Sequence, residues 1–564
     1  MTPSQALQTL IAEEWAARMR DDPLFATQSG VRIYDHLLPS VAPAVYERQL
    51  ERDRVFRERL AQIDRAALGA GDVVNYDLFS FVLQHRIALA PFRQYRIPLT
   101  SDEGFHVDVM RMAEGVAMTE MRDYESYLAR LRAVPAYFDE QIANMRQGIA
   151  DGFMLPEAVL PGIIDVVTGQ QYASADKTPF FAPFERFPDG IGASDRERLR
   201  DAGMRAIETA VLPAYRKLLA FFCKEYRLRA RLTLGASALP DGPAYYDALV
   251  KYFTNLDVTP EHVHHVGLDE VARIRAEMEA TMREAGFRGG FADFLEFLRT
   301  DAQFYAKTPA ELLARASAIA KEVDGLLPLY FNKLPREPYS IKAVPEELAP
   351  NYTAGRYMPA PRGGTRGGEY WVNTYALEKR PFYALTALTL HEAVPGHHLQ
   401  GALARELQDV PPFRLDFYPH AFGEGWGLYA EKLGIEMNLY KTPYDHFGRP
   451  SYEMWRACRL VVDTGLHAQG WSRERAFEYL ASHTALSTQE VRTEIDRYIA
   501  WPGQALAYKM GELKILELRE RAKHQLKAGF DLRAFHDAIL ASGGVPLPIL
   551  ERQIDAYIAK AMKH

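Results

Sequence analysis

The stretch PFYALTALTLHEAVPGHHLQ, residues 381–400, decides how the rest of the sequence is interpreted. Its first half is largely apolar and starts at a proline, as the first turn of a helix often does. Three histidines and one glutamate then follow within residues 391–398. A glutamate next to a histidine supplies a metal ligand and a general base at one point. The segment therefore predicts a helix over 381–394 that ends in a zinc site.

The spacing of the histidines differs from that of the common His-Glu-x-x-His helix, where the second histidine follows one turn after the first. Here that position is Pro395. Because proline lacks the amide that a regular helix uses, the turn must bulge or break. Such a turn brings His397 back toward His391, whereas on an unbroken helix His398 would lie roughly 10.5 Å further along the axis. We favour His391 and His397 as ligands, with His398 as the alternative ligand and otherwise a residue behind the ligands or facing the substrate.

A catalytic zinc site needs a third protein ligand besides the two histidines, and two downstream glutamates are candidates. Glu424 lies in FGEGWGLY, residues 422–429, where small neighbours let other backbones approach closely. Glu431 is the other candidate, because it lies on the same face of that helix. We favour Glu424.

The bulk composition is that of an ordinary soluble protein. The 564 residues are 48% hydrophobic and 25% charged, and the net charge of -7 gives no reason to expect nucleic acid. Cys223 and Cys458 are too far apart in sequence for a disulfide framework, and we expect two buried thiols. The N-terminus lacks the pattern of a secretory signal, and no apolar run is long enough to span a membrane. We therefore expect a cytoplasmic protein that binds no membrane, and we allow for a homodimer.

Apolar residues recur at helical spacing through most of the chain. The clearest predicted helices span 43–67, 119–147, 195–227, 260–285 and 308–326. Proline and glycine predict long loops at 150–194 and 235–243, and β-forming residues predict a short strand at 369–374. The expected fold is mainly α, large and multilobed, with a small β-element next to the histidine helix.

Four sequence blocks carry a resemblance to a known family, namely HEAVPGHHLQ, GEGWGLYAEKLG, RACRLVVDTGLHAQGW and RYIAWPGQALAYKMGELKILELR. They resemble the bacterial domain-of-unknown-function 885 (DUF885) family over about residues 350–530. The resemblance implies a gluzincin-like, helical metallopeptidase fold similar to those of carboxypeptidase Taq, thimet oligopeptidase and angiotensin-converting enzyme. Such a fold would be one unit over 1–564, or a helical N-terminal lobe 1–235 and a catalytic lobe 236–564.

The resemblance also implies roles for individual residues. His391, His397 and Glu424 would hold Zn²⁺, and Glu392 would deprotonate the metal-bound water and pass the proton to the leaving amine. Related helical peptidases stabilise the oxyanion with a tyrosine or histidine from the C-terminal part of the chain. Tyr508 is the first candidate for this donor.

His467 is the second candidate donor, and Asp463 precedes it by one helical turn, in position to orient it. Arg456, Arg459 and Lys509 either hold a substrate carboxylate or form structural ion pairs.

The predicted strand is a candidate for binding an extended peptide. Tyr370 and Asn373 lie on it, and an exposed strand edge can pair with a peptide backbone. The glycine-rich stretch 363–368, which precedes the strand, is either a flap over the site or a surface loop.

The leading prediction is zinc-dependent hydrolysis of peptide bonds in short peptides, of carboxypeptidase or oligopeptidase type. The alternatives are a zinc hydrolase of a non-peptide amide or ester and a non-catalytic, metal-stabilised binding protein. The presence of Glu392 next to His391 favours an enzyme, because a structural zinc site has no need of an adjacent base.

Overall fold

The structure is a computed structural model, and it describes residues 2–101, 103–114, 116, 118–346, 349–360 and 366–563. The chain forms two compact units. The first comprises Met1–Tyr245 with Ile499–Trp501, and the second comprises Tyr246–Tyr498 with Pro502–His564. Every candidate ligand, catalytic residue and substrate residue lies in the second unit. Residues 363–365 of the glycine-rich stretch 363–368, predicted as a flap or a loop, lie outside the described residues.

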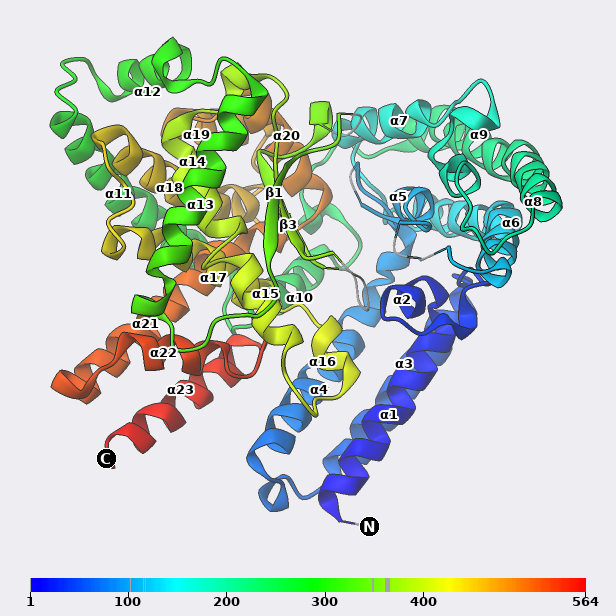
Figure 1. Cartoon of the computed structure of the whole chain (residues 1–564), viewed down its shortest axis with the longest axis horizontal. Coiled ribbons are helices and arrows are strands. Elements are labelled where there is room, and N and C mark those ends of the chain that lie inside the picture. The colour runs from blue at the N-terminus through cyan, green and yellow to red at the C-terminus, as the bar shows by residue number, and fades with distance from the viewer. Residues whose placement is uncertain are drawn as a thin grey trace. The chain divides into compact units, whose positions relative to one another are not determined.

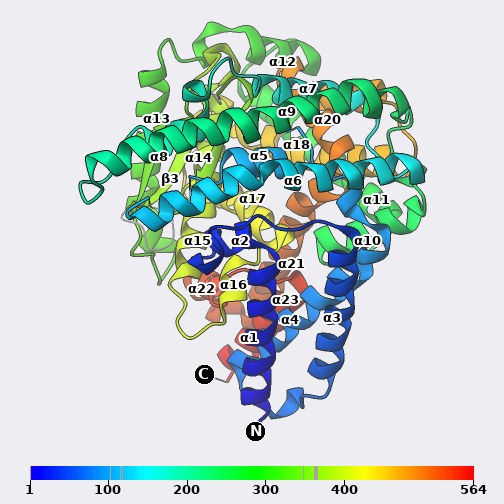
Figure 2. The same ribbon diagram turned by 90° about the vertical axis from the view of Figure 1, so that its right-hand side faces the viewer.

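The first unit is helical (Figures 1 and 2). Its helices are α1 (Pro3–Asp21), α2 (Pro23–Gln28), α3 (Pro43–Ala61), α4 (Ala70–Leu89), α5 (Phe105–Met110), α6 (Met121–Asp151), α7 (Leu160–Gly169), α8 (Ala193–Ala206) and α9 (Leu212–Phe221). A π-helical turn at Ile207–Val211 joins α8 and α9 into one long helix that packs along α6 (Figure 2). The predicted loop at 150–194 is wrong in part, because α7 forms within it. Pro161 occupies the first turn of α7, where a missing amide costs no hydrogen bond.

The second unit holds the remaining helices, and α10 (Gly242–Thr254) leads into it. They are α11 (Pro260–Glu284), α12 (Phe291–Thr300), α13 (Pro309–Tyr330), α14 (Phe382–Glu392), α15 (His397–Arg405), α16 (Pro412–Asp416), α17 (His420–Glu436), α18 (Pro443–His467), α19 (Arg473–His483), α20 (Thr488–Ala500), α21 (Ala507–Leu526), α22 (Leu532–Leu540) and α23 (Leu547–Ala561). The mainly α fold is confirmed.

The core of the second unit is built around α18, which is buried along most of its length. α11 and α14 pack against α18, and α17 packs against both α14 and α21 (Figure 1). α17 and α21 meet at Gly425 and Gly511, where a Cβ atom on Gly511 would lie 1.8 Å from the carbonyl oxygen of Ala421. Only glycine allows backbones to approach so closely, so these residues set the position of α17 against α21.

A small sheet lies against α13 and α14. Its strand order is β1 (Tyr339–Ala343), β3 (Gly368–Val372) and β2 (Gly355–Met358), with β1 parallel and β2 antiparallel to β3. The strand predicted at 369–374 is therefore present as β3. The prediction that this strand has an exposed edge is wrong, because β3 pairs with a strand on either side. The outer edges of the sheet belong to β1 and β2.

Two further sequence-based expectations concern cysteines and membranes. Cys458 is buried as expected, but Cys223 is exposed, because it lies on the outer side of a π-helical turn after α9. Among the described helices, none has both the length and the apolar character needed to cross a bilayer.

Candidate metal centre

The histidine segment breaks the helix instead of continuing it. α14 and α15 are separated by a turn in which the Val394–Pro395 peptide bond is cis. Gly396 suits this turn, since a Cβ atom there would lie 1.9 Å from the carbonyl oxygen of His391. The indole of Trp426 on α17 donates to the carbonyl oxygen of Pro395 at 2.8 Å. The turn brings His397 back beside His391.

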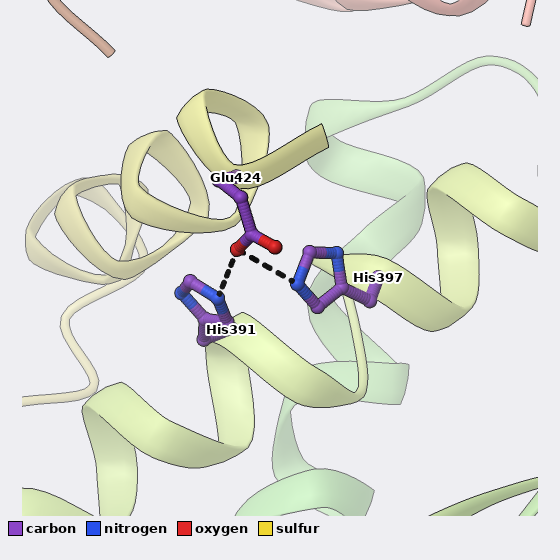
Figure 3. Close-up of side chains that lie close together, drawn as sticks. All are labelled: His391, His397 and Glu424. Atoms are coloured by element: carbon purple, nitrogen blue, oxygen red, sulfur yellow. Dashed lines mark ion pairs between the residues drawn. The ribbon is translucent and has the colours of Figure 1, made fainter. Parts of the chain in front are cut away.

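Three side chains meet at this turn (Figure 3). Nε2 of His391 and Nε2 of His397 each lie 3.5 Å from Oε2 of Glu424. One donor atom from each of the three residues lies within 4.8 Å of the others. Two imidazoles and one carboxylate that leave a coordination position open are a donor set of catalytic zinc sites. These residues therefore fit a zinc ion.

A further carboxylate orients His391 from behind. Oε1 of Glu431 lies 2.8 Å from Nδ1 of His391, and Arg456 pairs with the same oxygen at 3.4 Å. With its proton on Nδ1, the imidazole presents Nε2 as the ligand atom toward Glu424. Of the two glutamates that the sequence left open, Glu424 therefore takes the place of the ligand, and Glu431 supports the histidine.

The charges around the cluster favour a cation. Burial lowers the pKa of His391, but its hydrogen bonds to Glu424 and Glu431 outweigh burial and raise the pKa to about 10. For Glu424 burial acts in the other direction and raises the pKa, but the hydrogen bonds from His391 and His397 outweigh burial and hold this pKa well below its usual range. Metal binding displaces protons from ligands. The carboxylates that raise the pKa of His391 would also attract a metal cation to this position.

Glu392, the predicted general base, is the last residue of α14 and follows the first ligand directly. Its Oε2 accepts a hydrogen bond from the backbone amide of Tyr357 at 2.8 Å. Tyr357 lies on the edge strand β2, and this amide points away from β3. The sheet thus holds the Glu392 carboxylate beside the cluster.

His398, the alternative ligand, has other partners. Its Nδ1 lies 3.2 Å from the hydroxyl of Tyr357, and its Nε2 lies 3.1 Å from the carbonyl oxygen of Glu337. Arg405 donates to the same hydroxyl at 2.9 Å and also pairs with Glu337. The structure therefore gives His398 no ligand position. It belongs to the group that holds Tyr357 and, through it, Glu392.

Tyr508 is the second residue of α21 and lies close in sequence to Gly511, where α21 contacts α17. Burial and the Glu424 carboxylate raise the pKa of Tyr508, but the guanidinium groups of Arg497 and Arg459 outweigh them and lower it. The guanidinium of Arg459 lies 4.2 Å from the centre of the Tyr508 ring. A phenol in this cationic setting is a good hydrogen-bond donor to a developing oxyanion.

His467 and Asp463 make core contacts. Nε2 of His467 lies 2.8 Å from the carbonyl oxygen of Tyr498, and its ring packs against Tyr246. Asp463, which the sequence places in position to orient His467, bonds to other groups. Its carboxylate accepts hydrogen bonds from the hydroxyl of Tyr246 at 2.5 Å and from the amide of Gly503 at 3.1 Å. These contacts tie both side chains into the core, and a role of His467 as an oxyanion donor stays a prediction.

The three basic residues form ion pairs, which is one of the two roles left open by the sequence. Arg456 pairs with Glu431, and Arg459 pairs with Glu494 at 2.8 Å. Nζ of Lys509 lies within 2.9 Å of three carboxylates, those of Glu270, Glu453 and Glu512. All three basic side chains are almost fully buried. None of them is available to a substrate carboxylate in this structure.

Tyr370 and Asn373 are buried within the sheet layer, each 0% exposed. The Asn373 amide donates to the carbonyl oxygens of Tyr352 and Thr353, and its Oδ1 accepts from the amide of Tyr375. Neither side chain is exposed to a substrate in this structure, and that these two residues bind substrate stays a prediction. Their side chains fill the core and hold neighbouring loops.

Sequence reasoning missed two residues near the cluster. The hydroxyl of Tyr418 donates to Oε1 of Glu424 at 3.2 Å, and Tyr357 donates its amide to Glu392. Tyr418 lies in an irregular segment before α17, and β2 is a very short strand. In a chain with 30 tyrosines, no local pattern distinguishes these two.

Residues 23–554 match the family described as "Bacterial protein of unknown function (DUF885)". The chain belongs to this family. No curated protein matches it. Membership of DUF885 thus confirms the family recognised from the sequence blocks.

Two solved structures resemble this DUF885 chain. One is described as the crystal structure of the putative lipoprotein from Colwellia psychrerythraea. It is 28% identical, has a TM-score of 0.93, and the match covers 99% of this chain and 100% of that one. The other is described as a putative lipoprotein of unknown function from Shewanella oneidensis, with 17% identity, a TM-score of 0.74 and coverage of 98% and 99%. The second likeness shows the fold alone.

Proposed function

We propose that this DUF885 protein is a zinc-dependent, gluzincin-like hydrolase of peptide bonds in short peptides. The observation that carries the proposal is the convergence of His391, His397 and Glu424, with Glu392 directly after the first ligand. Three protein ligands leave a coordination position for the reaction, and the adjacent carboxylate supplies the base. A purely structural metal site would need neither.

Each side chain has a defined task in this proposal. Zn²⁺ bound at the cluster would polarise the substrate carbonyl and lower the pKa of water. Glu392 removes the proton from the attacking water and delivers it to the leaving amine. Glu431 keeps His391 in the orientation and tautomer that a ligand needs. Tyr508 donates a hydrogen bond to the oxyanion as it forms.

The outer edge of β2 supports a peptide as the substrate. Gly355 and Tyr357 alternate with residues that pair with β3, so their backbone groups point outward. The Tyr357 amide on this edge already reaches Glu392 at 2.8 Å. An extended peptide that pairs along β2 would bring its backbone to the same carboxylate. A small ester without a strand-like backbone would gain none of these contacts.

The proposal is tested by metal analysis and peptide digestion. We expect about one zinc ion per chain, as in other sites with three protein ligands. A mixed peptide pool should be cleaved by the zinc-loaded protein, spared after chelation, and cleaved again when zinc is restored. Cleavage of aryl esters or acyl amides but of no peptide would favour the non-peptide alternative. A zinc-loaded protein that hydrolyses neither class would contradict a catalytic role.

The cellular location and the oligomeric state remain predictions. A cytoplasmic protein is expected in the soluble fraction of its own cells, and a homodimer is expected to show twice the chain mass in light scattering.

A further inference from the structure

A cavity of about 280 Å³ lies in the second unit, beside the N-terminal half of α14. Leu385 and Leu388 line it from α14, and Tyr452 lines it from α18. Ala354, the residue before β2, forms another part of the wall. An apolar cavity of about 150 Å³ is large enough to hold a benzene molecule. This cavity therefore has room for one large side chain of a ligand.

The charged groups in the cavity wall balance one another. Three acids and three bases line it, namely Glu296, Glu378, Glu490, Arg299, Lys379 and Arg380. Arg380 pairs with Glu490 at 3.1 Å, and Nη1 of Arg299 lies 3.8 Å from Glu296. Most of the other wall residues are apolar or aromatic. Because the formal charges cancel and the rest of the wall is largely apolar, the cavity suits an uncharged apolar group better than an ion.

The cavity lies on the same face of α14 as Glu392, the proposed base. Leu385 and Leu388 precede Glu392 by seven and four residues on this helix. Residues at these spacings lie one above the other on a helix face. Four residues advance an α-helix by about 6 Å. The cavity wall therefore begins about one helical turn from Glu392.

β2 runs beside α14 from the cavity to Glu392. A Cβ atom on Gly355 would lie 3.3 Å from Cδ2 of Leu388, and two residues later the amide of Tyr357 donates to Glu392 at 2.8 Å. Two residues of a strand span roughly 7 Å, which matches the one helical turn between Leu388 and Glu392. A peptide paired along the outer edge of β2 with its scissile bond at Glu392 therefore has a residue about two positions away at the cavity.

The cavity also contacts the group that supports the metal cluster. The guanidinium of Arg456 lies 4.7 Å from the centre of the Tyr452 ring, and Tyr452 lines the cavity. The same guanidinium pairs with Glu431 at 3.4 Å, and Glu431 orients His391. A continuous row of side chains thus joins the cavity to the candidate metal centre.

We propose that this cavity is the subsite for a large apolar side chain of the peptide substrate, such as that of leucine or phenylalanine. The side chain lies against Leu385 and Leu388, about two residues from the bond that is cleaved. This inference rests on the proposed function, and it adds a preference for apolar over charged residues at one position of the peptide.

The first test uses capped alanine hexapeptides in which leucine, phenylalanine, lysine or aspartate replaces one alanine at each position in turn. The zinc-loaded full chain is given each peptide, and mass spectrometry identifies the cleaved bond while kcat/KM is measured. We expect leucine or phenylalanine about two residues from that bond to raise kcat/KM at least about tenfold over alanine, because more apolar surface is buried. Lysine and aspartate should not raise it. Equal kcat/KM for leucine and alanine at every position would overturn the proposal.

A variant that fills the cavity gives the second test. Ala354→Phe adds a ring to the cavity wall at a half-buried position. It should lower the ratio of kcat/KM for the leucine peptide to that for the alanine peptide by about tenfold, because the ring takes the space of the leucine side chain. Leu329→Phe is the matched control, since Leu329 on α13 is 66% exposed, and it should leave this ratio unchanged. An unchanged ratio in a folded Ala354→Phe protein would overturn the proposal. If that variant fails to fold, the wild-type peptides decide alone.

Failure of the subsite and failure of the proposed function give different results. Peptide cleavage without a preference for an apolar side chain removes the subsite and leaves the hydrolase. If the zinc-loaded protein cleaves no peptide, the proposed function fails, and calorimetric titration with the leucine and alanine peptides tests the cavity alone. Binding of a leucine peptide at least about tenfold more tightly than the alanine peptide supports the subsite, and equal binding overturns it.

Discussion

Glu431 accepts the hydrogen bond of Nδ1 of His391 at 2.8 Å, while Nε2 of the same ring faces Glu424 at 3.5 Å. The two glutamates lie on one face of α17, so a single helix provides a ligand and the support for another ligand. Arg456 on α18 pairs with Glu431 in turn. The candidate centre thus extends well beyond the three donor atoms.

Replacing Glu431 with glutamine should weaken zinc binding by about 10- to 100-fold, because loss of a support for a histidine ligand typically has this effect. Competition with a chromogenic chelator measures the change. Glu436→Gln is the matched control, since Glu436 ends the same helix and pairs with Arg519 at 2.6 Å, away from the cluster. Equal zinc affinity of the Glu431→Gln and wild-type proteins would contradict the supporting role.

The adjacent histidines of α15 provide a paired test. His397→Asn should remove stoichiometric zinc, because it deletes one of three ligands. His398→Asn should keep zinc and lower peptide cleavage about tenfold, because the hold on Tyr357 and Glu392 is loosened. Metal content and cleavage rate are both measured. The opposite pattern would assign the ligand to His398.

The sequence predicts the cluster well because its signals are local. Helix-breaking Pro395 next to Gly396 implies that the histidine after them returns toward His391, and the structure brings His397 there. Small residues on both sides of Glu424 imply a close helix contact, which is formed with Gly511.

The burial of the candidate substrate residues could not be predicted, because it depends on contacts distant in sequence. Nothing around Tyr370 shows that β3 is a central strand, since β1 and β2 come from other segments. The three carboxylates that surround Lys509 likewise come from three helices, including Glu270 on α11. Local patterns distinguish neither a strand edge from a strand interior nor a binding cation from a buried one.

Lys509→Met should destabilise the protein by about 3–5 kcal/mol, because it leaves buried carboxylates without their cation. Chemical denaturation measures the free energy of unfolding. Lys523→Met is the control, since Lys523 forms an exposed pair with Glu520, and its loss should cost at most about 1 kcal/mol. A stable Lys509→Met protein with a raised KM would instead indicate that Lys509 binds substrate.

Asp463 should make the protein less stable as the pH rises toward neutrality. Burial raises the pKa of Asp463 to about 7, although Tyr246, the Gly503 amide and Arg459 act in the opposite direction. The pKa of an aspartate in the unfolded chain is about 3.9, so the folded state binds the proton more tightly than the unfolded state does. Proton binding to Asp463 therefore stabilises the folded state at low pH, and this contribution to the free energy of unfolding is lost as the pH rises through the folded pKa.

The comparison is made with Asp463→Asn, which removes this titration. Between about pH 5 and about pH 7 the free energy of unfolding of the wild type should fall by about 2 kcal/mol more than that of the variant. Denaturant titrations at a series of pH values measure the difference. Parallel pH profiles for the two proteins would show that Asp463 is ionised throughout.

The central claim is that Glu392 acts as the base beside a zinc ion held by His391, His397 and Glu424. The most direct measurement is zinc content and peptide cleavage of Glu392→Gln beside wild type, with both proteins loaded in the same way. The account predicts that the variant binds zinc as the wild type does and loses at least about a hundredfold in cleavage rate. A zinc-loaded variant that cleaves peptides as fast as the wild type, or a wild type that binds no zinc, would contradict it.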